Sequence, residues 1–267
     1  MKGLLAVLVL GLAVLTGCGG SSSSGLIGNK GALAGNWQFT LTKTAAPRTV
    51  TLISGFLQQT GKAVTGSVQL TPPVFTPPCG GSFAVSGISD GQNVNLTVNE
   101  GGATVTLTGT GSATSMGGSY NLVASGCGKS ETGTFTATLI KPLNGTLQGV
   151  LHSTSNPSGG LVGGDFAITG LIAQSDNIGS SSGLLIGTLS AVNYPCFSDV
   201  TLSGTITGSS VQLNIIGPSG AVVGRIGGLS TGGAVTARPD GSGFFYFGTS
   251  TAVGYVMDKS NACTRLL

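Results

Sequence analysis

The chain has 267 residues, of which 7% are charged and 40% hydrophobic, and its formal net charge is +3. This hydrophobic share is enough to bury a core, which excludes an intrinsically disordered protein. A typical soluble domain has roughly 25% charged residues, so hydroxyl and amide side chains must solvate the exposed faces of this chain. The few charges are scattered and form no basic stripe, and we therefore expect no nucleic-acid partner.

Residues 1–17 have the features of a signal peptide. Lys2 gives a positive start, and an apolar run follows from Leu4 to Leu15. A helix over this run would rise about 18 Å, which is too short for a bilayer core of roughly 30 Å. A short charged start before a short apolar run is typical of a cleaved signal peptide and not of a membrane span.

The apolar run ends in Leu15-Thr16-Gly17-Cys18, which resembles the lipobox of bacterial lipoproteins. In that family the signal peptide is cut before the cysteine, the thiol receives a diacylglyceryl group and the new amine is acylated. The resemblance implies that Cys18 is lipidated and anchors the chain, because two or more acyl chains hold where one binds only reversibly. The alternative is an ordinary secretory signal with an incidental cysteine.

The resemblance also bears on which membrane holds the protein. Gly19 follows Cys18, so the Asp that acts as the inner-membrane retention signal of enterobacterial lipoproteins is absent from that position. The expected location is the cell envelope, with the outer membrane favoured and the periplasmic or surface face left open.

Residues 18–34 are expected to form the lipidated cysteine and a Gly/Ser tether. The run from Gly19 to Gly25 contains only Gly and Ser, a composition typical of a flexible coil. The twelve residues from Gly19 to Lys30 should span roughly 20 Å. We therefore expect the folded region to float near the bilayer without packing into it.

Two segments of the mature chain share a pattern at an offset of 117 residues. Pro78-Cys79 recurs as Pro195-Cys196, and Ser86-Gly87 recurs as Ser203-Gly204. Apolar positions agree at the same offset in five pairs: Phe83 with Val200, Val85 with Leu202, Val94 with Val211, Leu96 with Leu213, and Val98 with Ile215. We interpret this as a duplication of one β unit, at residues 35–142 and 143–267.

Apolar residues recur at every second position within each copy. Val94, Leu96 and Val98, for example, alternate with Asn and Thr, which predicts half-buried antiparallel strands. Asp90-Gly91 and Thr207-Gly208-Ser209 are typical of tight turns between such strands. Turn signals about every ten residues predict an all-β fold of two duplicated antiparallel units, each an up-and-down barrel or sandwich of about seven or eight strands.

Gly35-Asn36-Trp37 opens the first copy and resembles the G-x-W of lipocalin-type barrels, where the Trp closes one end of the barrel. The resemblance implies a barrel that carries a small apolar ligand, with a large apolar cavity beneath Trp37. The second copy has no Trp at the corresponding position. The alternative is that Trp37 simply packs in the core.

Four cysteines remain if Cys18 is lipidated, namely Cys79, Cys127, Cys196 and Cys263. An even number of cysteines in an exported chain predicts disulfides. Of three possible pairings we favour Cys79–Cys127 and Cys196–Cys263, one within each copy. We expect no metal or cofactor, because the cysteines are widely spaced and the only histidine, His152, is far from them in sequence.

Motifs for catalysis are weak in this sequence. G-x-S-x-G is centred on Ser89, Ser181 and Ser230, but chance matches are expected in a chain with 48 glycines, and no helix is expected after any of them. His152 lies in the expected inter-copy linker. Asp90 and Glu100 could approach each other across a hairpin.

Sparse ionisable residues also count against acid–base chemistry. We therefore expect no enzymatic activity, although a hydrolase with an unrecognised site stays an alternative. The aromatic stretch Phe244–Phe247 would be apolar on both faces of a strand, and is either buried or an exposed platform for a glycan or protein partner. The sequence thus predicts a membrane-anchored exported lipoprotein with a structural or binding role.

Overall fold

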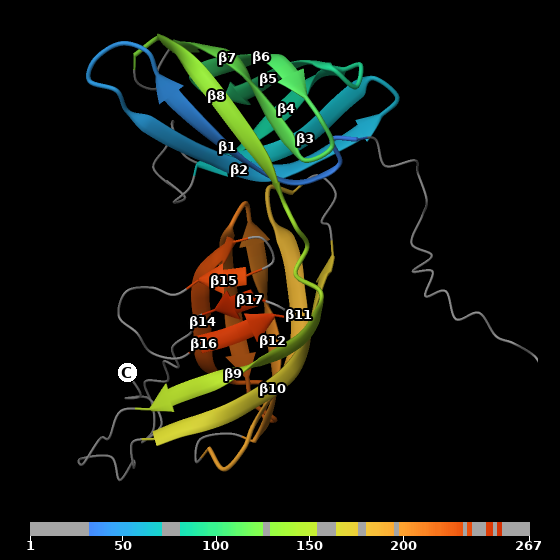
Figure 1. The fold of residues 1–267 in the computed structure, drawn as a ribbon, viewed down its shortest axis with the longest axis vertical. Helices are drawn as coiled ribbons and strands as arrows, with labels where there is room; N and C mark the ends of the chain where they lie inside the picture. The colour runs from blue at the N-terminus through green and yellow to red at the C-terminus, as the bar shows by residue number, and fades with distance from the viewer. Residues whose placement is uncertain are drawn as a thin grey trace, which may run out of the picture.

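The computed structural model of the protein describes residues 32–70, 81–124, 129–153, 164–175, 180–194, 198–231, 234–236, 244–247 and 250–252. Every regular element in these residues is a β-strand, and the strands form two antiparallel sheets (Figure 1). The all-β prediction is therefore confirmed. The first sheet ends at Ile140 and the second begins at Gly145.

The first sheet is a closed barrel in which each strand pairs with the next and β8 pairs with β1. Its strands are Gly35–Lys43 (β1), Val50–Thr60 (β2), Ala63–Leu70 (β3), Ser82–Ser89 (β4), Asn93–Glu100 (β5), Ala103–Gly111 (β6), Ser115–Ala124 (β7) and Glu131–Ile140 (β8). The open choice between a barrel and a sandwich is thus settled for this unit. The eight strands follow one another up and down, as the regular turn spacing predicts.

A single apolar core occupies the interior of the first barrel, because every second residue of each strand points inward. Trp37 is 0% exposed, and no buried hydrophobic residue of this core is more than 5% exposed. A ligand-sized cavity would expose the atoms that line it. The described side chains therefore fill the interior, as an eight-stranded barrel allows.

The second sheet has nine strands in the order β15-β14-β13-β12-β11-β10-β9-β16-β17. They are Gly145–Ser153 (β9), Gly164–Ser175 (β10), Gly183–Ala191 (β11), Asp199–Thr207 (β12), Ser210–Ile216 (β13), Val222–Thr231 (β14), Ala234–Thr236 (β15), Phe244–Phe247 (β16) and Ser250–Ala252 (β17). The sheet curls until its two edge strands, β15 and β17, lie side by side (Figure 1). The count exceeds the expected seven or eight because the end of the sheet is divided into short strands.

The two sheets repeat one topology with a shift of eight strands. The 117-residue offset places β4 on β12 and β5 on β13, and β9 pairs with β16 as β1 pairs with β8. All five apolar pairs that match in the sequence are buried in both units. The duplication is therefore real in three dimensions as well as in the sequence.

A hydrogen bond outside the matched sequence block is also duplicated. The backbone N–H of Leu33 donates to Gln59 Oε1 at 3.0 Å, and the N–H of Leu143 donates to Gln174 Oε1 at 3.0 Å. Each leucine is 1% exposed, and in each unit it precedes the first strand. The glutamine amides thus hold the chain entering each unit in the same way.

Gly87 and Gly204, which the sequence repeat pairs, occupy equivalent crowded positions. A Cβ on Gly87 would overlap the Asn95 carbonyl oxygen and lie 2.8 Å from Leu96 Cα. A Cβ on Gly204 would overlap the Gln212 carbonyl oxygen in the same way. The repeated glycine therefore lets the adjacent strands approach closely at this position.

Candidate functional site

All five cysteines lie outside the described residues. Lipidation at Cys18 and the disulfides among Cys79, Cys127, Cys196 and Cys263 therefore stay predictions.

The three G-x-S-x-G serines are not followed by a helix in the described parts of the chain. Ser89 ends β4 and is buried, and its Oγ accepts a hydrogen bond from the Gly91 N–H at 3.4 Å. Ser181 is also buried, and its Oγ donates to Gln69 Oε1 at 3.4 Å. Ser230 lies within β14. None is placed as a nucleophile elbow would place it.

Asp90 and Glu100 do not approach each other, contrary to the possibility raised from the sequence. Asp90 lies in the turn before β5 and Glu100 is the last residue of β5, so the length of an eight-residue strand, about 23 Å, separates them. Asp90 instead stabilises its own turn. Hydrogen bonds from the side chain and backbone of Asn93 and from the backbone of Gln92 lower the pKa of Asp90 to about 2.

His152 lies in β9, where its backbone is opposite Asp165 of β10. The expectation that it lies in a linker between the copies is therefore wrong, because β9 extends past it to Ser153. Among the described residues, no three His, Cys, Asp or Glu side chains gather as metal ligands would.

Phe244–Phe247 does form a strand, β16, which pairs with β9 and β17. Its side chains lie outside the described part of the structure.

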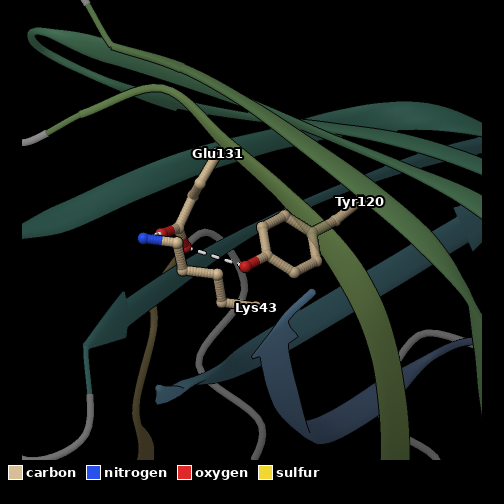
Figure 2. Close-up of polar contacts among 3 residues, drawn as sticks. All are labelled: Lys43, Tyr120 and Glu131. Carbon is tan, nitrogen blue, oxygen red and sulfur yellow. Dashed lines mark hydrogen bonds and ion pairs between the residues drawn. The ribbon is translucent and has the colours of Figure 1, made fainter. Parts of the chain in front are cut away.

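A polar cluster at one rim of the first barrel joins three strands (Figure 2). The hydroxyl of Tyr120 on β7 donates to Glu131 Oε1 of β8 at 2.8 Å. Lys43 Nζ of β1 lies 3.6 Å from Glu131 Oε2. Burial, with a further contribution from the hydrogen bond to Glu131, raises the pKa of the Tyr120 hydroxyl well above its usual value. Tyr120 therefore stays a hydrogen-bond donor at physiological pH.

This rim cluster is suited to a structural role. The glutamate is neutralised by the ammonium group and fixed by the phenol, so its charge is balanced where the apolar core ends. The cluster holds one carboxylate, whereas hydrolysis of a glycoside needs two positioned ones. Lys43 and Glu131 keep 26% and 22% of their side chains exposed, which places the ion pair at the mouth of the barrel.

A second polar site joins the two units. The Nδ2 of Asn36 on β1 donates to the Gly208 carbonyl oxygen, and the Gly208 N–H donates to Asn36 Oδ1, both at 2.8 Å. The next residue, Ser209, donates its N–H to Gln38 Oε1 at 3.1 Å. The β12–β13 turn thus docks on the outer face of β1, where Asn36 is 2% exposed.

Phe56 supplies the apolar part of this junction. It belongs to the core of the second sheet although it lies on β2 of the first barrel, and it is 4% exposed. Its ring lies against the start of β11, where a Cβ on Gly183 would come 2.6 Å from Phe56 Cζ. The wall of the first barrel therefore contributes a side chain to the core of the second unit.

Sequence reasoning missed this junction, although a signal for Phe56 exists. Ile53 and Leu57 are four residues apart and face inward, so Phe56 must face outward from the same strand. A large aromatic side chain on an outward position indicates a second contact. Asn36 gives a weaker signal, since Asn is also common on exposed strands of this chain.

Comparisons with protein-family models, with curated proteins and with solved structures give no match to this chain. Within the residues that the structure describes, no helix has the length and apolar character needed to span a bilayer.

Proposed function

We propose that this protein is an exported lipoprotein, anchored to a membrane through Cys18, whose joined β units have a structural or binding role rather than an enzymatic one. The observation that carries the anchoring is Leu15-Thr16-Gly17-Cys18 directly after a short apolar run. The outer membrane is the favoured location because Gly19 follows the cysteine.

The contents of the first barrel favour a structural or surface-binding role. An eight-stranded barrel can either be filled with side chains or hold a small ligand. Here the inward side chains around Trp37 are almost fully buried, so they occupy the volume that an apolar ligand would need. The two polar sites, at the rim and at the junction, each stabilise the fold.

Metabolic acyl labelling tests the anchor. A radiolabelled fatty acid should be incorporated into the wild type and lost in Cys18→Ser, which should also leave the membrane fraction. Ser22→Ala, in the tether, is the matched control and should keep the label. Label retained in Cys18→Ser would refute the anchor.

A small-molecule carrier remains the second candidate, because a β-barrel is compatible with it. It predicts saturable binding of one fluorescent fatty acid per chain, lost when the interior is altered. The filled interior predicts no saturable binding. A stoichiometric site that Val105→Trp abolishes in a still-folded variant would favour the carrier.

The pairing of Cys79 with Cys127 rests on the sequence alone. The connection from β3 to β4 and the connection from β7 to β8 leave the same rim of the barrel, but they leave it four strands apart, on opposite sides. Mass spectrometry of non-reduced peptides tests the pairing, and a Cys79–Cys196 bridge would overturn it.

A further inference from the structure

The outer face of β10 and β11 carries an exposed apolar patch. Leu171, Leu184 and Ile186 are 60%, 46% and 61% exposed, and Ala173 is exposed beside them. Ala173 is opposite Ile186 in the strand register. Leu171 and Leu184 are each two residues away along their own strands, so all four side chains share one face. We call these four residues the β10–β11 patch.

The surroundings of the patch are polar but uncharged. The residues directly opposite it on the same face are Thr146, Ser175, Thr188, Ser203 and Thr205. These neighbours carry no charge. Covering the patch would therefore bury apolar area without the cost of removing a charged group from water.

The duplication shows that this face corresponds to a docking face in the first unit. Strand pairing gives the following correspondences: Leu57 with Ile172, Gly66 with Gly187, and Val85 with Leu202. Leu171 therefore holds in the second unit the position that Phe56 holds in the first. Phe56 is 4% exposed because the second unit covers it, whereas Leu171 is 60% exposed.

The first unit of a second copy fits the patch poorly. Phe56 packs in a socket beside Gly183 and Ile206 of the second unit. The corresponding residues of the first unit are Lys62 and Ser89, which are polar. The first unit of another copy thus offers no apolar socket to Leu171.

The described chain begins close to the junction with the second unit. The described chain begins just before Leu33, and Asn36 is already bonded to Gly208 of the second unit. The adjacent Thr207 hydroxyl is hydrogen-bonded to Ser182, two residues before Leu184. A Gly/Ser coil of twelve residues spans roughly 20 Å, so a bilayer that holds Cys18 lies within reach of this side of the molecule.

We propose that the β10–β11 patch contacts the lipid bilayer to which Cys18 is anchored and so fixes how the two units face away from it. This inference rests on the proposed lipid anchor and revises the expectation that the folded region only floats. Leu and Ile side chains enter the boundary between headgroups and acyl chains, and binding scales with the apolar area buried there. The acyl anchor makes even a small patch sufficient, because it keeps the surface at high effective concentration.

Quenching of a tryptophan reporter by brominated lipids tests the contact. The full acylated chain with Ile186→Trp is reconstituted in vesicles of phosphatidylethanolamine and phosphatidylglycerol, with or without dibrominated acyl chains. Trp37 is 0% exposed and should not be quenched. The matched control is Thr108→Trp, at an exposed position on β6, across the barrel from β2.

Bromolipid should reduce the Ile186→Trp signal at least about twofold more than that of the control, and Leu171→Ser in the reporter chain should diminish this difference. Equal or absent quenching in both acylated reporters would overturn the contact and leave the anchor standing. Concentration-dependent dimers of the solubilised chain, abolished by Leu171→Ser, would overturn it in favour of self-association. Loss of the acyl label itself would instead refute the anchor.

Discussion

The side-chain amide of Asn36 makes two hydrogen bonds with the backbone of Gly208, a residue 172 positions later in the chain. One is donated and one accepted, which is how a residue of a neighbouring strand would pair. A single buried side chain therefore acts as a strand partner for the β12–β13 turn. The junction between the units therefore depends on residues of both units.

Asn36→Ala should destabilise the protein by about 2–6 kcal/mol. The substitution leaves the N–H and the carbonyl of Gly208 without these partners in a buried place, and each unsatisfied group costs about 1–3 kcal/mol. Urea unfolding followed by circular dichroism measures the loss. Asn95→Ala is the control, because Asn95 is exposed on β5 and should change stability by less than about 0.5 kcal/mol. Equal effects of the two substitutions would contradict the assigned role of Asn36.

Gly208→Ala should lower the free energy of unfolding by more than the positive φ of this residue alone explains. Gly208 has φ +54°, and its added Cβ would overlap Ser54 Oγ and Cβ, which cannot both be moved by side-chain rotation. Gly220 has φ +79° and nothing within 4 Å of an added Cβ, so Gly220→Ala isolates the backbone cost of about 1–2 kcal/mol. Thermal unfolding should show Gly208→Ala to be the worse variant. Similar melting temperatures for Gly208→Ala and Gly220→Ala would show that the junction accommodates the added methyl group.

Gly87→Ala and Gly204→Ala should each prevent stable folding of their unit. In both, the new methyl group would overlap a backbone carbonyl oxygen of the adjacent strand. Gly117 lies in β7 of the same barrel as Gly87, but the nearest atom to its added Cβ is the Phe135 carbonyl oxygen at 3.5 Å. Gly117→Ala should therefore be tolerated within about 1 kcal/mol. The soluble yield and the urea unfolding midpoint of the three variants test this prediction. A stable Gly204→Ala variant would disprove the equivalence of Gly204 and Gly87.

Local periodicity was sufficient to predict most of the strands. Val94, Leu96 and Val98 point into the core as their alternation indicates, and Asp90-Gly91 forms the expected hairpin turn, with φ +93° at Gly91. The duplication was visible because Pro-Cys and the alternating apolar residues recur at one offset, and these apolar residues are buried in both units. These features depend on neighbours in the chain or in the adjacent strand.

Features that depend on distant contacts were not predictable in the same way. His152 stands among serines and threonines that resemble a linker, but pairing with β10 makes the segment a strand. Asp90 and Glu100 are ten residues apart, and only the strand length shows that they lie far from each other. The junction needs the two units to be placed together, which no local pattern specifies.

Tyr120→Phe should make stability less sensitive to alkaline pH. Burial and the bond to Glu131 raise the pKa of the folded-state hydroxyl above the unfolded value of about 10. This contribution is complete below pH 10 and is lost as pH rises toward the folded pKa. At neutral pH the variant loses a hydrogen bond worth about 1–2 kcal/mol.

Melting curves between pH 7 and 11 test the Tyr120 prediction. The stability gap between wild type and Tyr120→Phe should narrow above pH 10. Phenolate absorbance near 295 nm gives an independent check, because Tyr120 should ionise in the native protein only above its usual pKa. A phenolate signal that the native wild type shows at pH 10 and Tyr120→Phe lacks would contradict the prediction, because it would show that Tyr120 is already ionised.

Asp90→Asn should remove part of the acid sensitivity of the first barrel. Hydrogen bonds from Asn93 and Gln92 lower the folded-state pKa of Asp90 to about 2, below the unfolded value of about 3.9. The carboxylate therefore stabilises the fold above pH 4, and this contribution is lost as pH falls from about 4 to 2. Wild type should melt above Asp90→Asn at pH 6, and the difference should close by pH 2. Asn93→Ala should reduce that difference, since its side-chain donor is the largest cause of the lowered pKa. A gap that stays constant between pH 6 and pH 2 would contradict the prediction, because it would mean that the turn does not favour the carboxylate of Asp90 over the protonated acid.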